Sequence, residues 1–167
     1  MVCAKNLGAA LLAAGALVAA PGARADMAMC SLLGGMALAN AKLGAVHGLA
    51  GVVGGTADVP HGLACARLLA PVIEANVRAL PAGHPALDRY AEAARLLTGQ
   101  PAATVGDGLA WIHETLVLLA VPGLAAFGLG PEHADEIAAK AMTSSSMQGN
   151  PVPLSHEDLR AALIQAL

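Results

Sequence analysis

The spacing of apolar and polar residues predicts a chain of helices separated by short breaks that contain glycine or proline. The first clear helical pattern begins near Asp26, and its apolar stripe includes a histidine among aliphatic residues. The members of this stripe are Leu32, Met36, Ala39, Leu43, His47 and Ala50. We therefore expect a helical stripe through this region, with His47 facing the interior.

A glycine-rich break over residues 51–59 separates this pattern from the next one, because the paired glycines within it can take positive φ. Pro60 suits a first helical position, since its φ is already set and it has no N–H to satisfy. His61 then lies in the first turn of the following helix. Pro71 is expected to kink or restart that helix.

The second half of the chain shows further helical patterns, bounded by residues that typically start or stop helices. A loop is expected over residues 81–85, and another over residues 143–153. Capping-box patterns, glycines and prolines mark the remaining boundaries. These boundary residues are Gly99, Thr104 with Asp107, Pro122-Gly123, Gly130-Pro131, and Ser155 with Asp158.

The composition strengthens the helical prediction. Hydrophobic residues make up 56% of the 167 residues, but aromatic residues only 2%, so alanine and leucine supply most of the apolar surface. Both are strong helix formers, whereas the residues that favour strands are sparse. We predict an all-α helical bundle of six or seven helices. The net charge of −3 and the absence of a Lys/Arg cluster argue against a nucleic-acid partner.

The N-terminal segment is expected to stand apart from this bundle. Lys5 precedes an apolar run that ends at a Pro-Gly-Ala-Arg-Ala sequence, which fits the description of a secretory signal over residues 1–25. We divide the chain into an apolar segment, residues 1–22, that is signal-like or a non-native start, and a helical metal-binding domain, residues 23–167. The cysteines, three in number and without C-x-x-C spacing, favour a reducing compartment. A cytoplasmic location is expected, with export as the alternative.

Two histidines are the strongest candidates for chemistry. A tight reversal between the two helices would bring His47 and His61 to one point, which is how two elements build a metal site. The alternative is that each is a hydrogen-bonded core residue. Cys65, four residues after His61 on the same helical face, is either a further ligand or a small buried side chain. His84, His133 and His156 lie on polar or loop segments and are expected to be solvated.

The stretches GAVHGLAG and VPHGLACARLLAPV around these histidines resemble the iron-containing alcohol dehydrogenases, whose helical C-terminal domain carries a similar pair of metal-binding histidines. The resemblance runs from about residue 23 to residue 167 and includes the SSSMQGNP loop. It implies an NAD(P)-dependent, metal-dependent oxidoreductase that acts on an alcohol or aldehyde. It also implies that His47 and His61 bind a divalent metal, iron or zinc, and that the late loop lies beside the active-site cleft.

The sequence departs from this family pattern in three ways. No Asp-x-x-x-His step, the source of the family's other two metal ligands, precedes His47. The family's nucleotide domain with its glycine-rich phosphate loop is missing, and Gly51 stands where many members carry another histidine. The resemblance therefore implies the C-terminal metal-binding half of such an enzyme, inactive as this chain alone. Its expected partners are a missing N-terminal half or further copies of the chain.

Other functions remain compatible with the residues. One is an exported or scaffold-type helical module for metal binding or protein interaction, without enzymatic activity. Another is a structural bundle in which the histidines are coincidental. Within the family resemblance, maleylacetate reductase is the alternative parent activity. The sequence assigns no catalytic or cofactor-binding residue.

Overall fold

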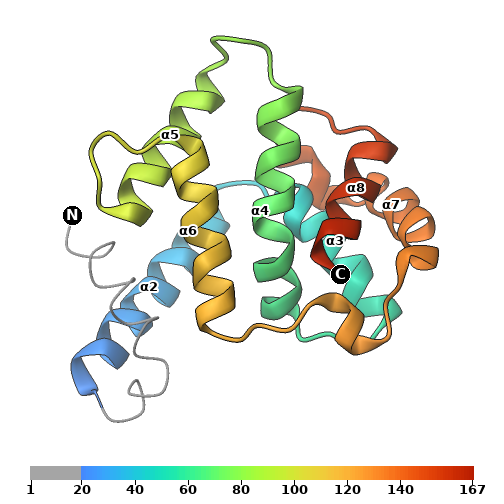
Figure 1. The fold of residues 1–167 in the computed structure, drawn as a ribbon, viewed down its shortest axis with the longest axis horizontal. Coiled ribbons are helices and arrows are strands. Elements are labelled where there is room, and N and C mark those ends of the chain that lie inside the picture. Colours follow the sequence, from blue (N-terminus) through green and yellow to red (C-terminus); the bar gives the residue numbers. More distant parts are fainter. Residues whose placement is uncertain (1–19) are drawn as a thin grey trace. The chain divides into compact units, whose positions relative to one another are not determined.

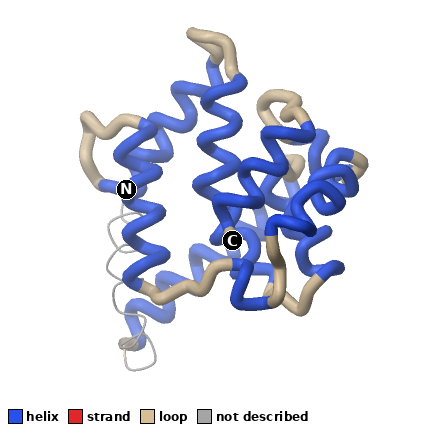
Figure 2. Tube along the Cα trace, turned by 45° about the vertical axis from the view of Figure 1, so that its right-hand side comes forward, coloured by secondary structure: helices blue, strands red, loops and turns tan. Residues whose placement is uncertain are grey.

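In the computed structural model, which describes residues 20–167, the regular elements of the described chain are all helices (Figures 1 and 2). This confirms the all-α prediction for that part. The α-helices are α2 (Pro21–Asn40), α3 (Ala45–Thr56), α4 (His61–Ala79), α5 (Pro85–Thr98), α6 (Val105–Leu118), α7 (Ala134–Met142) and α8 (His156–Ala166). Short 3-10 turns are η1 (Leu124–Phe127), η2 (Pro131–His133) and η3 (Ser145–Gly149).

Most of the predicted N-terminal segment, residues 1–22, lies outside the described residues. Only residues 20–22 of that segment are described, and α2 already begins at Pro21. The separate status of residues 1–22 thus stays a prediction. Among the helices of residues 20–167, no single one is both long and apolar enough to cross a membrane. The consecutive pair α2 and α3 meets that test only when the two are taken together.

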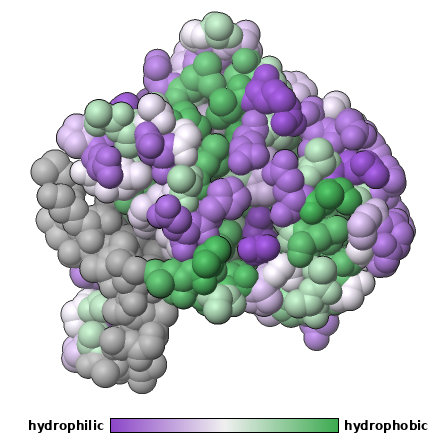
Figure 3. Space-filling model, in the orientation of Figure 1, coloured by the Kyte–Doolittle hydropathy of each residue, from purple (hydrophilic) through white to green (hydrophobic). Residues whose placement is uncertain are grey.

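The chain divides into two compact units. In its described part, the first comprises residues 20–40 and 83–120, and the second comprises residues 41–82 and 121–167. In the first unit, α5 packs against α6, and the predicted helix boundaries at Gly99 and at the Thr104–Asp107 capping box are confirmed. A hydrophobic patch lies over the C-terminal end of α6 in Figure 3, where Val117 and Leu118 are exposed.

The predicted apolar stripe that joins Leu32 and Met36 to His47 is wrong. It is divided between two helices, because α2 ends at Asn40 and α3 begins at Ala45. No residue of α2 is buried, and Leu32 and Met36 are more than half exposed. Helical spacing identified the secondary structure correctly. It did not identify the buried face, because a stripe is buried only where a neighbouring element covers it.

The predicted break over residues 51–59 is also too early. Helix α3 continues to Thr56, and neither Gly54 nor Gly55 has positive φ. A helical glycine costs up to ~1 kcal/mol, whereas burying a valine contributes about 1.5–3 kcal/mol. Val53 is fully buried, so packing outweighs the glycine cost in this last turn.

Pro71 neither ends nor restarts its helix, as α4 runs through it from His61 to Ala79. Pro71 is buried together with its neighbours Ala70 and Val72. Tertiary packing of this face therefore holds the helix across the lost backbone hydrogen bond.

The second unit is a ring of four helices. Helix α4 contacts α3 and α8, and α7 contacts the same two helices (Figure 1). Their facing sides form one core of aliphatic residues, many of them alanines, so the helices approach closely. The largest fully buried members are Leu49, Leu68, Leu124, Ile137, Leu159 and Leu163.

We predict that Gly108→Ala destabilises the α5–α6 pair by ~1–3 kcal/mol in urea unfolding. A Cβ on Gly108 would lie 2.7 Å from the Cβ of Ala94 and 3.0 Å from its Cα, so the two helices would have to separate. Gly106→Ala, in the same helix, is the matched control. A Cβ there would meet only the Thr104 hydroxyl oxygen at 3.6 Å, and stability should stay within about 1 kcal/mol. Equal effects of the two substitutions would contradict the close crossing.

Candidate metal centre

The two predicted site histidines come from consecutive helices of the second unit. His47 is in the first turn of α3, and His61 is the first residue of α4. A short linker joins the helices, in which Ala57 ends α3 with its N–H bonded to the Val53 carbonyl and Pro60 precedes His61. The reversal predicted from the glycines is therefore made by this linker instead.

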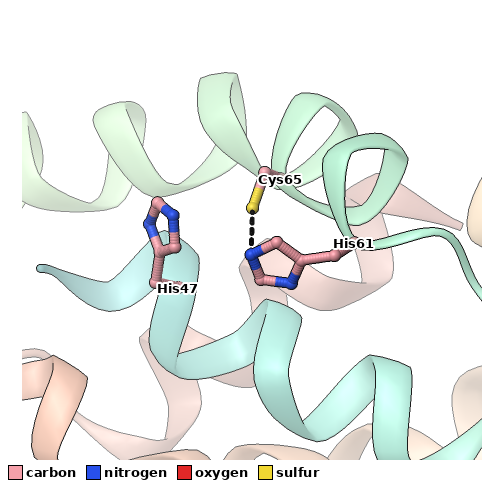
Figure 4. Close-up of side chains that lie close together, drawn as sticks. All are labelled: His47, His61 and Cys65. Atoms are coloured by element: carbon pink, nitrogen blue, oxygen red, sulfur yellow. Dashed lines mark hydrogen bonds between the residues drawn. The ribbon is translucent and has the colours of Figure 1, made fainter. Parts of the chain in front are cut away.

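The structure brings the two imidazoles together and adds a thiol (Figure 4). The ring centroids of His47 and His61 are 5.5 Å apart and the ring planes are tilted by 51°. Cys65 Sγ lies 3.5 Å from His61 Nε2. One potential ligand atom from each of the three residues lies within 4.8 Å of the others. Imidazole nitrogen and thiolate sulfur are ligands that zinc and related divalent metals prefer, so this donor set fits a metal.

The electrostatics of the cluster favour uncharged side chains. Burial, and secondarily repulsion from the neighbouring His61 when that ring is charged, lower the pKa of His47. Burial raises the pKa of the Cys65 thiol. Neutral imidazole is the form that binds metal, so the surroundings of His47 favour the form of this side chain that can act as a ligand. A bound cation would favour loss of the Cys65 proton.

A pair of amide side chains, buried Asn76 and half-buried Asn150, fixes the start of α3, which carries His47. Gly44, the N-cap of α3, has no side chain to accept from the first-turn N–H groups. Asn150 supplies that acceptor, since its Oδ1 lies 3.1 Å from the Ala45 nitrogen. The same side chain donates from Nδ2 to Asn76 Oδ1 at 2.6 Å and to the Val152 carbonyl at 2.7 Å. Asn76, on α4, is 2% exposed and its Nδ2 approaches Asn150 Oδ1 at 3.3 Å.

This junction ties the late loop to both helices of the site. Asn150 follows η3, so the loop over residues 143–153 is partly helical and is more than a connector. Gly149 allows the close approach, because a side chain there would collide with the Leu43 carbonyl and the Lys42 side chain. The sequence signal for this role was the Gly-Asn-Pro step, but no spacing rule links residue 150 to residues 45 and 76.

The same loop borders a cavity of about 550 Å³. Its lining residues fall between Met142 and Leu154, and none of the three cluster residues is among them. The cavity is thus a different feature from the metal-ligand cluster.

The other histidines predicted to be solvated have structural contacts instead. His84 Nδ1 accepts from the Ala86 N–H at 3.1 Å as the N-cap of α5, and His133 Nδ1 accepts from the Gly130 N–H at 3.0 Å. His156 Nε2 lies 3.1 Å from the Asp135 carbonyl oxygen. The contacts of His84 and His133 are local, whereas that of His156 joins α8 to α7, and none of the three rings belongs to the cluster.

Gly51 follows His47 by one helical turn, and a Cβ built there would meet nothing within 4 Å. The position at which the family resemblance implies a further histidine in many members is therefore open in this chain.

The chain resembles known proteins over nearly its whole length. Residues 6–167 match the family model described as Fe-containing alcohol dehydrogenase family, C-terminal. That range begins before residue 23, where the sequence analysis placed the start of the resemblance. 1,3-Propanediol dehydrogenase of Citrobacter freundii is 36% identical over 71% of this chain and 28% of its own length. Alcohol dehydrogenase 4 of Schizosaccharomyces pombe is 32% identical over 87% of this chain and 33% of its own length.

A solved structure gives the same result. The crystal structure of 1,3-propanediol oxidoreductase superposes with a TM-score of 0.85 at 28% identity, covering 99% of this chain and 43% of that one. The chain thus spans about a third of the curated relatives described above and less than half of this structure.

We predict that, in the metal-free chain, His47 titrates below the ordinary histidine value of about 6.5 in an NMR pH titration. Because the folded-state pKa is lowered, the unfolded chain binds this proton more readily. The stability that depends on neutral His47 is therefore present above the ordinary value and lost as the pH falls towards the lowered one. His61→Ala should raise the midpoint only partly, because burial is the larger cause. His84→Ala is the control and should leave it unchanged. A midpoint at or above the ordinary value would contradict this description.

We predict that Asn150→Ala lowers the free energy of unfolding by ~1–3 kcal/mol, the typical cost of leaving buried polar groups without a partner. The substitution removes the acceptor of the Ala45 N–H and the donor to Asn76. Asn40→Ala is the matched control, because the exposed Asn40 side chain donates to the Met36 carbonyl within its own helix. Chemical denaturation measures both. If Asn150→Ala costs no more than Asn40→Ala, the junction does not stabilise the unit.

Proposed function

The chain belongs to the iron-containing alcohol dehydrogenase family, matching its C-terminal part, and on this basis we propose that it is the metal-binding half of an NAD(P)-dependent alcohol-oxidising enzyme. The observation that carries the proposal is the placement of His47 beside His61. The two residues are far enough apart in sequence to lie on separate helices, yet their rings are 5.5 Å apart between centroids. Both histidines occupy the motif positions at which the family resemblance implies metal ligands.

The cluster residues have the properties that such a site requires. His47 is half-buried and held neutral, and His61 is exposed, so the pair offers one sheltered and one accessible ligand. A divalent iron or zinc ion bound here would supply Lewis-acid chemistry towards an alcohol oxygen. The role of the chain is to hold the two imidazoles at a fixed separation through α3, α4 and the Asn150 junction.

The substrate class follows from the relatives. Proteins similar to this chain are named for 1,3-propanediol, choline and alcohol oxidation. We therefore propose a small alcohol, or the corresponding aldehyde, as substrate. The nicotinamide cofactor would be bound by a nucleotide-binding half, which corresponds to the part of the relatives that this chain does not cover. These 167 residues alone are then proposed to be inactive.

A cytoplasmic location is part of the same proposal. It is supported by the family match that begins at residue 6, inside the signal-like run. The intact mass of the chain from its native cells distinguishes the alternatives, because export with cleavage after Ala25 would leave Asp26 as the first residue.

We predict that the isolated chain binds Zn²⁺ or Fe²⁺ weakly, and that His47→Ala and His61→Ala each abolish the binding in isothermal titration calorimetry. Loss of either ring leaves too few ligands to hold an ion. His84→Ala is the matched control, since it removes an imidazole outside the cluster and should bind like the wild type. Circular dichroism should show that all variants remain helical. Binding that survives in both cluster variants would refute the assignment.

The same preparation should show no NAD(P)-dependent oxidation of 1,3-propanediol or ethanol. A measurable rate of oxidation by the isolated chain would contradict the proposal that the nicotinamide cofactor is bound by a separate half of the enzyme.

A further inference from the structure

Cys65 lies in the cluster in a position that neither the family pattern nor the proposed function uses. It follows His61 by four residues on α4, so the two side chains lie on the same face of the helix. Its Sγ is 3.5 Å from His61 Nε2, and with a nitrogen of His47 the three ligand atoms lie within 4.8 Å of one another. The thiol is partly buried, and no disulfide partner is present among the described residues.

The separation of the sulfur and the nitrogen suits a shared ion. Zinc–nitrogen bonds of ~2.0–2.1 Å and a zinc–sulfur bond of ~2.3 Å at a tetrahedral angle place the two ligand atoms about 3.5 Å apart. That is the distance between Cys65 Sγ and His61 Nε2. At the same angle two metal–nitrogen bonds place their nitrogens about 3.3–3.4 Å apart, so separations in the cluster of up to 4.8 Å would have to close by as much as about 1.4 Å around a bound ion. His61 is exposed and is the first residue of its helix, so solvent borders the ring that would have to move.

We propose that Cys65 is a third metal ligand, and that His47, His61 and Cys65 together form a site for a borderline-soft divalent cation such as Zn²⁺ or Co²⁺. The inference rests on the proposed metal site at the two histidines. It adds a thiolate to a pair of imidazoles, and sulfur ligation favours zinc and cobalt over hard cations such as Mg²⁺. Three protein ligands leave a fourth tetrahedral position open to water or another small ligand.

The decisive experiment uses Co²⁺ with the full chain carrying Cys3→Ser and Cys30→Ser, so that Cys65 is the remaining thiol. Anaerobic titration should produce a near-ultraviolet thiolate-to-cobalt charge-transfer band. Adding Cys65→Ser should remove the band and weaken Co²⁺ binding at least about tenfold, since even the loss of an outer-shell partner costs about 10–100-fold. In an otherwise wild-type chain, Cys30→Ser is the matched control and should preserve both band and affinity.

The outcomes separate this inference from the proposed function. Co²⁺ binding that requires both histidines, shows no thiolate band and is unchanged in Cys65→Ser overturns the cysteine ligand and leaves the two-histidine site standing. An absence of binding to the folded chain overturns both.

Alkylation of the wild-type chain gives an independent measurement if Cys65→Ser fails to fold. Trypsin cuts after Lys5, Arg24, Lys42 and Arg67, which places the three cysteines on three different peptides. Zn²⁺ should slow iodoacetamide labelling of Cys65 and not that of Cys3 or Cys30, as measured by mass spectrometry. Equal labelling of Cys65 with and without Zn²⁺ would overturn the proposal.

Discussion

The Asn150 side chain connects the three parts of the chain that the metal-ligand cluster needs. It accepts from the first N–H of α3 and exchanges hydrogen bonds with the buried Asn76, near the C-terminal end of α4. An amide can do this because one end accepts while the other donates. Since Gly44 cannot cap α3 itself, the direction in which this helix leaves the loop depends on Asn150. The position of His47, two residues after Ala45, depends on it as well.

The rest of the second unit supports this junction through close packing of small residues. Alanines occupy much of the shared core of α3, α4, α7 and α8. Small side chains let the helix backbones approach, which keeps the first turn of α3 near the first turn of α4. His61 directly follows the linker that joins α3 to α4, whereas His47 is in the first turn of α3, at the other end of that helix, so it is the packing of α3 against α4 that brings the two rings together. The geometry of the site is therefore a property of the unit and not of the His-containing motifs alone.

The helical content and most helix boundaries could be predicted because they depend on local signals. Thr104 with Asp107 and Ser155 with Asp158 form the capping boxes that their spacing indicated, and Gly99 ends α5 in the left-handed conformation. The predictions failed where tertiary packing determines the helix ends and the buried faces. Val53 keeps α3 helical past two glycines, Pro71 remains inside α4, and Leu32 and Met36 are more than half exposed. The proximity of His47 and His61 followed from their motifs, whereas the contact of Asn150 with residues more than 70 positions away had no local signal.

We propose that this fold holds His47 and His61 as ligands of one metal ion. Anomalous diffraction at the zinc absorption edge, from crystals of the chain grown with zinc, tests it most directly. We expect an anomalous peak about 2.0–2.1 Å from a ring nitrogen of each histidine. A map in which zinc occupies other sites and leaves the space between these two rings empty would contradict it.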